Sequence, residues 1–230
     1  MSVNKVPSHI GIIPDGNRRW AKSKGMEAFK GHSKSAEIGN VASLLGEAKK
    51  LGVEYVSIWG FSTENWNRPE LEKRFLFKLL VKSFNEFLAY AHEDKIRIRH
   101  IGRKDRLPKE VVATLEKLEN ETAKYKEFNV NFCMDYGGRD ELIRAVNKMI
   151  ADGKNGVDEI SFASYLDTVG IPDVELIIRT SGEQRTSGFM PFQSDYAELY
   201  FSEKYFPDFK PEDLREAIEW FSDRKRNFGK

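Results

Sequence analysis

Residues 9–20 read HIGIIPDGNRRW, an apolar run that ends in a polar turn with two arginines. The β-branched run over 9–14 has the length of a strand. Further apolar runs lie at 55–60, 96–101, 129–134 and 174–178, with a weaker one at 199–201. Helical patterns between and after these runs cover residues 33–51, 69–93, 108–125, 139–150 and 211–221. This alternation predicts an α/β fold, a mostly parallel six-stranded sheet flanked by helices on both faces.

The composition fits a single domain over residues 1–230. Hydrophobic residues make up 40% of the chain and charged residues 32%, which allows a sizeable core. Lys and Arg total 37 against 36 Asp and Glu, and the net charge of +1 argues against a globally basic nucleic-acid binder. The single cysteine, Cys133, excludes an internal disulfide and a cysteine-rich zinc site.

Targeting and membrane-spanning patterns are absent from the sequence. No apolar run reaches the ~18–20 residues that would cross a bilayer, and the N-terminal residues do not have the pattern of a signal peptide. Together with the single cysteine, these observations predict a cytoplasmic protein, with any membrane contact confined to its surface.

The residues that follow the first strand suit an anion site. In parallel sheets ligands bind beyond the carboxyl ends of the strands. The turn from Asp15 to Trp20 leads into a helix start, which offers backbone N–H groups to an anion. The arginines Arg18 and Arg19 add charge-assisted donors for phosphate. The alternative is a structural turn with a capping aspartate, because Asp-Gly-Asn is a common turn sequence.

Two later loops, which follow the second and fifth apolar runs, also carry side chains that suit a ligand site. Residues 60–69, GFSTENWNRP, place polar and aromatic side chains after the second run, although solvated connections also have this composition. After the fifth run, Arg179 and Arg185 flank hydroxyls and glycines, a pattern that fits a cradle for a second anion. The alternative for this loop is a surface segment with solvated arginines.

A metal and a long apolar ligand are also suggested. Asp15 and Glu198 together with diphosphate oxygens would suit Mg²⁺, although a lone glutamate at a strand edge is usually solvated. Residues 74–91 carry many Phe and Leu side chains. They predict either a broad core-facing helix surface or the lining of an apolar cavity.

Four segments, taken together and in order, resemble the cis-prenyltransferase family, which includes the undecaprenyl diphosphate synthases. They are IGIIPDGNRRWA, GFSTENWNRP, YGGRDEL and RTSGEQRTSGFMPFQSDYAELYF, within residues 10–201. The resemblance implies a homodimeric α/β enzyme with a hydrophobic tunnel. It also implies Mg²⁺-dependent condensation of an allylic diphosphate with isopentenyl diphosphate to a cis-polyprenyl diphosphate.

The resemblance also assigns roles to individual residues. By the family pattern Asp15 binds Mg²⁺ and helps the allylic diphosphate leave, with Ser62 and Asn65 as further catalytic residues, and Glu198 occupies the second metal position. Segments that match the family's substrate-binding motifs comprise Gly16, Asn17, Arg18, Arg19, Trp20, His32, Phe61, Ser62, Glu64, Asn65, Trp66, Arg68, Arg179, Arg185 and Ser187.

Some positions depart from the family pattern. Pro14, Ala28 and Ser35 stand where methionine, arginine and glycine are common, and all three fall on the allylic side. They suggest an unusual allylic substrate, a short product or irregular, non-head-to-tail coupling. Residues 227–229, Asn-Phe-Gly, replace the usual Arg-x-Gly, which often completes the partner subunit's site.

Two further alternatives belong to other classes. A non-catalytic partner subunit is argued against by the intact Asp-Gly-Asn sequence at 15–17. The basic runs at 97–106 and 224–226 could bind nucleic acid or acidic lipid, but the near-zero net charge favours a solvated surface and no nucleic-acid partner.

Overall fold

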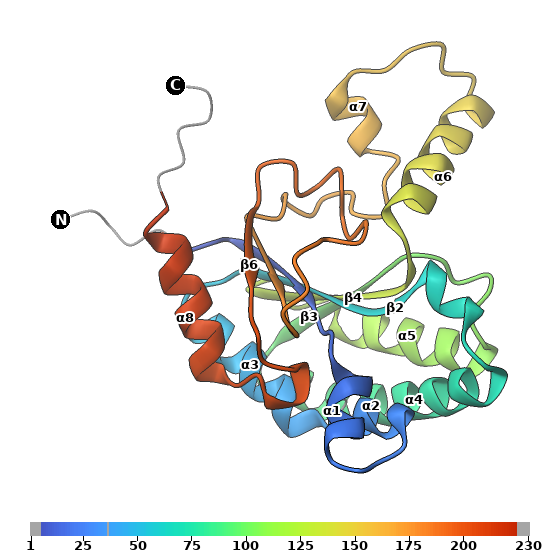
Figure 1. Ribbon diagram of the computed structural model, residues 1–230. Coiled ribbons are helices and arrows are strands. Elements are labelled where there is room, and N and C mark those ends of the chain that lie inside the picture. Colours follow the sequence, from blue (N-terminus) through green and yellow to red (C-terminus); the bar gives the residue numbers. More distant parts are fainter. Residues whose placement is uncertain (1–5, 36, 225–230) are drawn as a thin grey trace.

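Six strands form one parallel sheet in the order β3-β4-β2-β1-β5-β6 in the computed structural model (Figure 1), which describes residues 6–35 and 37–224. The strands are β1 (His9–Ile13), β2 (Tyr55–Ser62), β3 (Ile96–Ile101), β4 (Phe128–Tyr136), β5 (Leu176–Arg179) and β6 (Glu198–Phe201). The α-helices are α1 (Asn17–Ser23), α2 (Gly31–Ser35), α3 (Ile38–Lys50), α4 (Glu70–Glu93), α5 (Lys109–Thr122), α6 (Gly138–Ala151), α7 (Glu159–Ala163) and α8 (Pro211–Ser222). Short 3₁₀ turns are η1 (Ala28–Lys30), η2 (Thr63–Asn67) and η3 (Phe206–Asp208).

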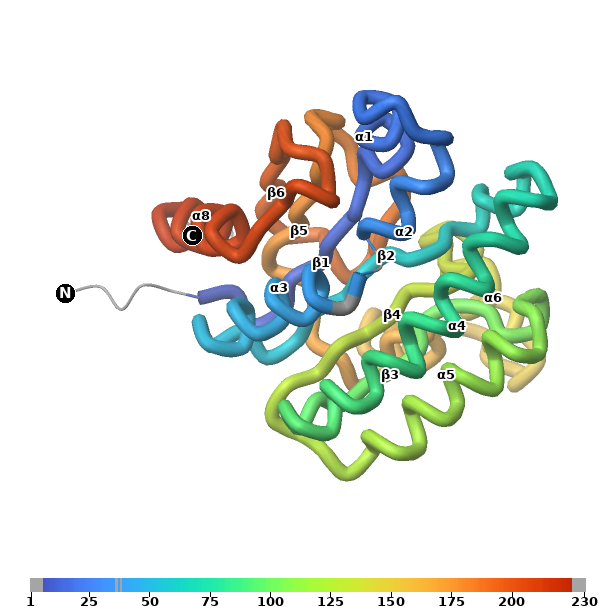
Figure 2. Tube along the Cα trace, turned by 90° about the horizontal axis from the view of Figure 1, so that it is seen from below, coloured from blue at the N-terminus to red at the C-terminus, as the bar shows by residue number. Residues whose placement is uncertain are grey.

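The two faces of the sheet are covered differently. Helices α3, α4, α5 and α8 pack on one face (Figure 2), over the larger cluster of buried apolar side chains. On the other face, Phe189 and Met190 from the β5–β6 connection form a smaller cluster with strand residues such as Cys133. Helices α6 and α7 project from this side (Figure 1). The predicted six-stranded parallel sheet with flanking helices is therefore confirmed.

Three predicted boundaries were wrong for local reasons. The helix predicted over 33–51 is two helices, because Glu37 is extended (φ −58°, ψ 122°) between α2 and α3. The strand predicted at 174–178 begins later, because the amide of Val174 donates to the carbonyl of Gln193 at 2.8 Å. The polar turn after β1 contains a complete short helix, α1, of which the sequence predicted only the start. Residues 227–229 lie outside the described part of the chain.

Strand register brings the first and fifth loops together. Ile13, the last residue of β1, is paired with Arg179, the last residue of β5. The loops at 14–19 and 180–188 therefore leave the sheet side by side at its carboxyl edge. Within residues 6–35 and 37–224, no helix has both the length and the apolar character needed to cross a membrane.

A chain of polar groups crosses three strands inside the sheet. His9 is fully buried, and its Nδ1 donates to the carbonyl of Pro172 at 2.7 Å, since a carbonyl oxygen can only accept. Its Nε2 then accepts from the hydroxyl of Ser57 at 2.8 Å, and Asn131 donates to that hydroxyl at 2.9 Å. Burial, partly offset by the Pro172 bond, lowers the pKa of His9 from 6.5 to about 4. The imidazole is therefore neutral in the folded protein.

Stability is expected to fall in acid because of this histidine. The unfolded chain binds a proton at His9 below pH 6.5, whereas the folded chain resists protonation until about pH 4. Stability from the neutral ring is therefore complete above pH 6.5 and is lost as the pH falls toward 4, by about 3 kcal/mol. Urea unfolding of wild type and His9→Gln from pH 7 to pH 4 measures this loss, because the difference between their free energies of unfolding should shrink on acidification. Parallel stability curves would contradict the assignment.

Candidate active site

Asp15 and Arg179 form the centre of the site at the carboxyl edge of the sheet. Arg179 Nη2 donates to Asp15 Oδ2 at 2.8 Å. Arg179 Nη1 donates to the Ser187 hydroxyl at 2.8 Å and to the Arg185 carbonyl at 2.6 Å. The Arg179 side chain is 6% exposed and that of Asp15 is 33% exposed. The arginine is thus held in place by the loop 185–187, while the carboxylate still reaches the surface of a cavity.

The turn after β1 holds the Asp15 carboxylate from the other side. The Gly16 amide donates to Asp15 Oδ1 at 2.6 Å, and Gly16 has φ +95°. A Cβ at Gly16 would lie 2.5 Å from the Tyr205 ring, so this close approach requires glycine. The Thr180 hydroxyl accepts from the Asp15 amide at 2.9 Å and donates to the Asp15 carbonyl at 2.8 Å. Both carboxylate oxygens therefore have fixed positions.

Asp15 is ionised at neutral pH. Burial alone would raise the pKa of this carboxyl, but the hydrogen bonds from Arg179 and Gly16 and the positive charges of Arg179 and Arg19 outweigh it. The pKa of Asp15 is consequently held below its usual value. A carboxylate has about four lone-pair sites, so the oxygens of Asp15 can still accept a cation or a donor.

A second set of cationic and neutral donors lies across the cavity mouth. Arg18, His32 and Arg68 all line the cavity together with Asp15. Burial and the charges of Arg68 and Arg18 lower the pKa of His32 to about 4, so its ring is neutral. Within the described residues, His32 Nε2 is buried without a hydrogen-bond partner. These groups have donor capacity that an anionic ligand could use.

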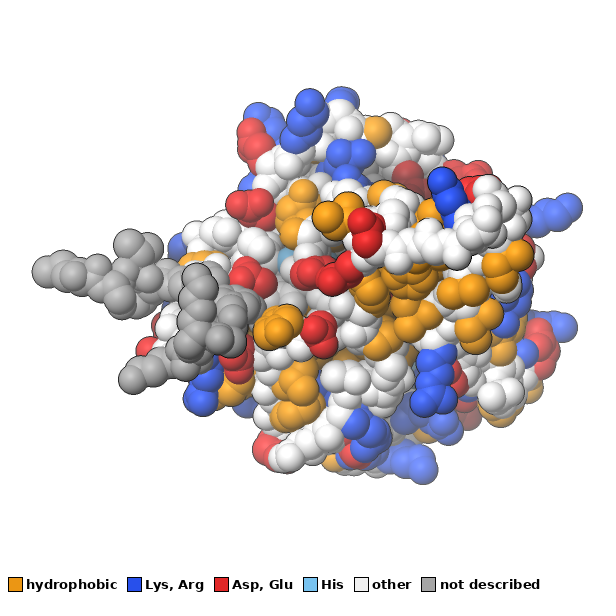
Figure 3. All heavy atoms as spheres, turned by 90° about the horizontal axis from the view of Figure 1, so that it is seen from above, with side chains coloured by type: hydrophobic (Ala, Val, Ile, Leu, Met, Phe, Trp, Pro, Cys, Tyr) orange, Lys and Arg blue, Asp and Glu red, His pale blue; other side chains and the backbone are white. Residues whose placement is uncertain are grey.

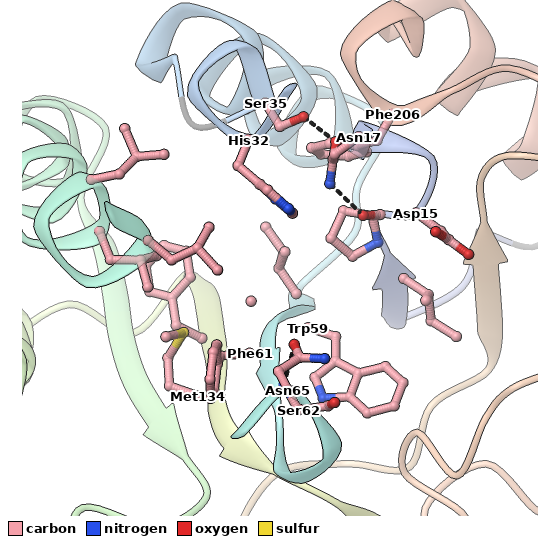
Figure 4. A pocket seen from close by; sticks show the side chains of 18 of the residues that line it. Asp15, Asn17, His32, Ser35, Trp59, Phe61, Ser62, Asn65, Met134 and Phe206 are labelled. Atoms are coloured by element: carbon pink, nitrogen blue, oxygen red, sulfur yellow. Dashed lines mark hydrogen bonds between the residues drawn. The ribbon is translucent and has the colours of Figure 1, made fainter. Parts of the chain in front are cut away.

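The cavity has a volume of about 720 Å³ and changes character along its length. Its mouth is polar and is lined by Asp15, Asn17 and His32, and in Figure 4 the ring of His32 points into it. Its remaining wall is apolar and comes chiefly from α4, β4 and β2: Ile58, Phe61, Leu76, Leu79, Leu80, Phe84, Phe87, Phe132 and Met134. The sequence predicted that residues 74–91 either face the core or line an apolar cavity, and helix α4 does both. Phe77 and Leu88 belong to the core, while Leu79 and Leu80 line the cavity.

Irregular strand pairing shapes the second loop. The register between β2 and β4 shifts between Trp59 and Phe61 and again between Phe61 and Ser62. These shifts leave Gly60 and Asp135 without a partner in the register, and irregularities of this kind are common beside active sites. Asn65 Oδ1 accepts from the Ser62 amide at 3.1 Å, which closes the turn that follows β2. The cavity-lining members of this loop are Gly60, Phe61, Ser62, Glu64, Asn65 and Arg68.

Trp66 supports this loop and does not line the cavity. Its indole Nε1 donates to Asp135 Oδ1 at 2.8 Å, and its ring packs 5.5 Å from that of Phe61 and 5.6 Å from that of Phe77. Arg106 also donates to Asp135, which is completely buried. These contacts place Trp66, a predicted substrate contact, against Asp135 and two phenylalanine rings, where it supports the loop.

Two other predicted substrate contacts lie elsewhere. The Arg185 side chain is 57% exposed and pairs with Glu183 at 2.5 Å, and only its carbonyl meets Arg179. Trp20, on α1, is absent from the residues that line the cavity. Gly16, Asn17, Arg18, Arg19, Arg179 and Ser187 do line it.

Glu198 is not brought to Asp15 within one chain. It pairs with Leu176 in the register of β5 and β6, three residues before Arg179, and so lies roughly 10 Å along the strand from that arginine. It is also absent from the cavity lining. The predicted pair of metal-binding carboxylates is therefore not formed within the chain, because the short parallel strand places Glu198 at the opposite edge of the sheet.

The remaining donor set still fits Mg²⁺ held jointly with a substrate. Among the described residues, no group of three or more His, Cys, Asp or Glu side chains could enclose a metal. Mg²⁺ commonly takes one or two carboxylates together with substrate phosphate oxygens. Asp15 offers an ionised carboxylate beside arginines that could hold those phosphates.

No individual role was predicted from the sequence for three residues that support the site. Thr180 and Ser181 follow β5 directly, where a ligand was expected, and Ser181 accepts from Arg19 at 2.6 Å. Their position at a strand end was a usable signal. Asp135 had no such signal, because its partner Trp66 lies 69 residues away.

The C-terminal part of the basic run at 97–106 is neutralised by its neighbours. Arg103 pairs with Asp105 at 2.6 Å, and Lys104 pairs with Glu119 at 2.7 Å. Arg106 pairs with Asp135. The positive charges of Arg103, Lys104 and Arg106 are therefore paired within the fold.

The sequence of this chain matches a known protein family over almost its whole length. The prenyltransferase family model of undecaprenyl diphosphate synthases matches residues 13–229. The isoprenyl transferase of Aquifex pyrophilus is 42% identical over 226 residues, covering 98% of this chain and 97% of that protein. The Bacillus cereus isoprenyl transferase is also 42% identical, and the match covers 97% of this chain and 88% of that protein.

Solved structures agree with the sequence comparisons. The crystal structure of lavandulyl diphosphate synthase from Lavandula x intermedia, in complex with dimethylallyl diphosphate, has a TM-score of 0.93 at 32% identity and covers 98% of this chain and 99% of that chain. A probable undecaprenyl diphosphate synthase from Campylobacter jejuni has a TM-score of 0.83 at 30% identity and covers 99% and 100%.

The fold and the site define an α/β enzyme that transfers prenyl groups, with a charged mouth opening onto an apolar cavity. The chain belongs to the cis-prenyltransferase family of undecaprenyl diphosphate synthases and isoprenyl transferases.

Proposed function

We propose that the protein condenses an allylic prenyl diphosphate with isopentenyl diphosphate in a Mg²⁺-dependent reaction, which releases diphosphate and forms a cis-polyprenyl diphosphate. The observation that carries this proposal is the Asp15–Arg179 pair at the mouth of a cavity whose far wall is apolar. A diphosphate requires the charged end and a growing prenyl chain requires the apolar end. The apolar part is the proposed tunnel.

The two diphosphates would occupy different groups of residues. Gly16, Asn17, Arg18 and Arg19, with His32 and Arg68 nearby, are the proposed site for the allylic diphosphate. Arg179 and Ser187 are the proposed site for the isopentenyl diphosphate, and the exposed side chain of Arg185 would have to turn from Glu183 to join them. Ser62, Asn65, Phe61 and Glu64 line the wall between the mouth and the apolar part, where they would orient the reacting carbons.

The chemistry follows from these positions. The allylic C1–O bond breaks and the electron pair leaves with diphosphate, whose new charge the arginines stabilise. The double bond of isopentenyl diphosphate then forms a new bond to C1, and the proton lost from its C2 passes to an oxygen of the released diphosphate. The apolar wall excludes water from the allylic cation. Asp15 would hold Mg²⁺, which when bound supplies further charge neutralisation for the leaving group.

Product analysis tests the proposal. Purified protein would be incubated with isopentenyl diphosphate and allylic primers of increasing length, with Mg²⁺ or with a chelator, and the products identified by mass spectrometry. We expect head-to-tail products in the presence of Mg²⁺ and none with the chelator. Absence of prenyl coupling with every primer would refute the proposed function and favour a non-catalytic partner subunit.

Irregular coupling is a second candidate. The lavandulyl diphosphate synthase structure matches this chain with a TM-score of 0.93, against 0.83 for the Campylobacter jejuni structure. Pro14 and Ser35, which depart from the family pattern, both line the cavity. Branched products from dimethylallyl diphosphate alone would favour this candidate, whereas ordinary long-chain product from farnesyl diphosphate would exclude it.

We further propose that the enzyme is a homodimer joined through α6. Ile143, Val146 and Ile150 are 62%, 43% and 67% exposed, and their spacing places them along one side of the helix. Ile160 on α7 is 85% exposed. Apolar side chains gather on the face that carries these helices (Figure 3). A mass near twice 26.5 kDa by sedimentation is expected, and a monomer would contradict the proposal.

A cytoplasmic location with peripheral contact to a membrane surface is a further proposal. Leu71 lies in the first turn of α4 and is 81% exposed, and the neighbouring Arg68 lines the cavity mouth. Sedimentation with anionic vesicles tests this contact, and equal recovery with and without vesicles would argue against it.

A further inference from the structure

Ser35 contacts the allylic side of the site directly. It is the last residue of α2, is 8% exposed and lines the cavity. Its hydroxyl donates to Asn17 Oδ1, and Asn17 Nδ2 donates to the Pro14 carbonyl at 3.0 Å (Figure 4). Asn17 is also 8% exposed. The Ser35 hydroxyl thus holds the oxygen of the Asn17 side-chain amide, and the Pro14 carbonyl holds its nitrogen.

These contacts fix which end of the amide faces which neighbour. The Pro14 carbonyl can only accept, so the nitrogen of Asn17 must lie on that side. The oxygen of Asn17 then faces Ser35, whose hydroxyl donates to it. An amide nitrogen has two hydrogens, so one N–H of Asn17 remains after the bond to Pro14.

Close packing holds α2 in this position. A Cβ on Gly31, the first residue of α2, would lie 1.9 Å from the backbone oxygen of Asn17. His32 follows on the same helix, and in Figure 4 its ring points toward the Asn17 amide. His32 Nε2 has no hydrogen-bond partner among the described residues. An anion placed between His32 and Asn17 would meet unused nitrogen groups from both.

We propose that Ser35 is a positioning residue that orients the Asn17 amide, so that Nδ2 rather than Oδ1 is presented to the allylic diphosphate. The inference rests on the proposed function and extends it to a residue outside the family pattern. Without the hydroxyl, Asn17 Oδ1 becomes a buried acceptor without a partner, and the amide gains freedom to rotate. An oxygen turned toward the diphosphate would repel it.

Substitutions at Ser35 test this role in turnover. Ser35→Ala and Ser35→Gly both remove the hydroxyl, and each is expected to raise KM for the allylic diphosphate about 5- to 20-fold. KM for isopentenyl diphosphate should stay within about twofold, because Arg179 and Ser187 do not contact Ser35 in any described hydrogen bond. Ser35→Thr keeps a hydroxyl and should restore most of the affinity. Equal changes in both KM values, or none in either, would overturn the proposal.

A double-mutant cycle separates orientation from general loosening of α2. In an Asn17→Ala background the hydroxyl has no amide to orient, so adding Ser35→Ala should change affinity for the allylic substrate by less than about twofold. An undiminished effect of Ser35→Ala in that background would show that Ser35 acts by another route.

Calorimetry with inorganic diphosphate distinguishes failure of this inference from failure of the proposed function. All proteins compared carry Arg179→Ala, which weakens the second anion site. Diphosphate binding by these variants therefore reports on the allylic site. Weaker binding by Ser35→Ala than by its Ser35 parent supports the inference even where no primer is turned over. Equal binding by the two proteins contradicts it, whatever the turnover assay finds.

Discussion

Asp15→Ala is expected to lower turnover by a factor of about 10² to 10³ while the protein remains folded. Asp15 is the ionised carboxylate at the point where the proposed leaving group develops its charge. Its removal would take away the protein's proposed ligand for Mg²⁺. It would also leave Arg179 free to swing from its present position, because Asp15 Oδ2 is one of its three fixed acceptors.

The measurement is the rate of diphosphate release at saturating substrates over a range of Mg²⁺ concentrations. Asp105→Ala is the matched control, since Asp105 is a 62% exposed carboxylate that also pairs with an arginine. Loss of such a surface pair costs at most about 1 kcal/mol, and turnover should be unchanged. Circular dichroism checks that both variants fold. Near-normal turnover by folded Asp15→Ala would refute the assignment of this carboxylate.

Arg179→Ala is expected to raise KM for isopentenyl diphosphate by about 10- to 100-fold, with a smaller loss in kcat. Arg179 is buried, and its Nη1 and Nη2 donate to Ser187 and Asp15. These bonds hold the guanidinium in one orientation, in which it would bind a phosphate. Arg179→Lys should recover little, because an ammonium cannot reproduce the planar fork.

The same substitution should change the pH dependence. Arg179 lowers the pKa of Asp15, so its removal raises that pKa and fewer Asp15 carboxylates are ionised at a given acidic pH. The acid limb of the rate profile is therefore expected to move to higher pH in Arg179→Ala. An unchanged acid limb would show that ionisation of Asp15 does not control the rate there.

Arg185→Ala is the control for Arg179. The Arg185 side chain is exposed, and the bond that fixes Arg179 uses the Arg185 carbonyl, which alanine retains. The rise in KM should therefore be several-fold smaller than in Arg179→Ala. Equal effects would indicate that the Arg185 side chain turns toward the substrate when it binds.

Local patterns accounted for much of the fold. The apolar runs predicted all six strands, because buried parallel strands are short and rich in β-branched residues. The parallel arrangement then predicted that Asp15 and the residues after Arg179 would lie at the ligand-binding edge. The break at Glu37 and the turn closed by Ser62 and Asn65 were not predicted, because an extended backbone at one residue and a single hydrogen bond within a loop leave no mark on the hydrophobic periodicity.

The sequence by itself determined the order of strands and helices, the edge of the sheet that carries the polar loops, and the residue types available there. These follow from hydrophobic periodicity and chain direction, which are local properties. Only the tertiary structure decided that Arg179 pairs with Asp15 across 164 residues, that Ser35 holds Asn17, and that Glu198 lies at the opposite edge. Strand register and helix packing set these distances, and both are fixed by contacts between segments that are remote in the chain.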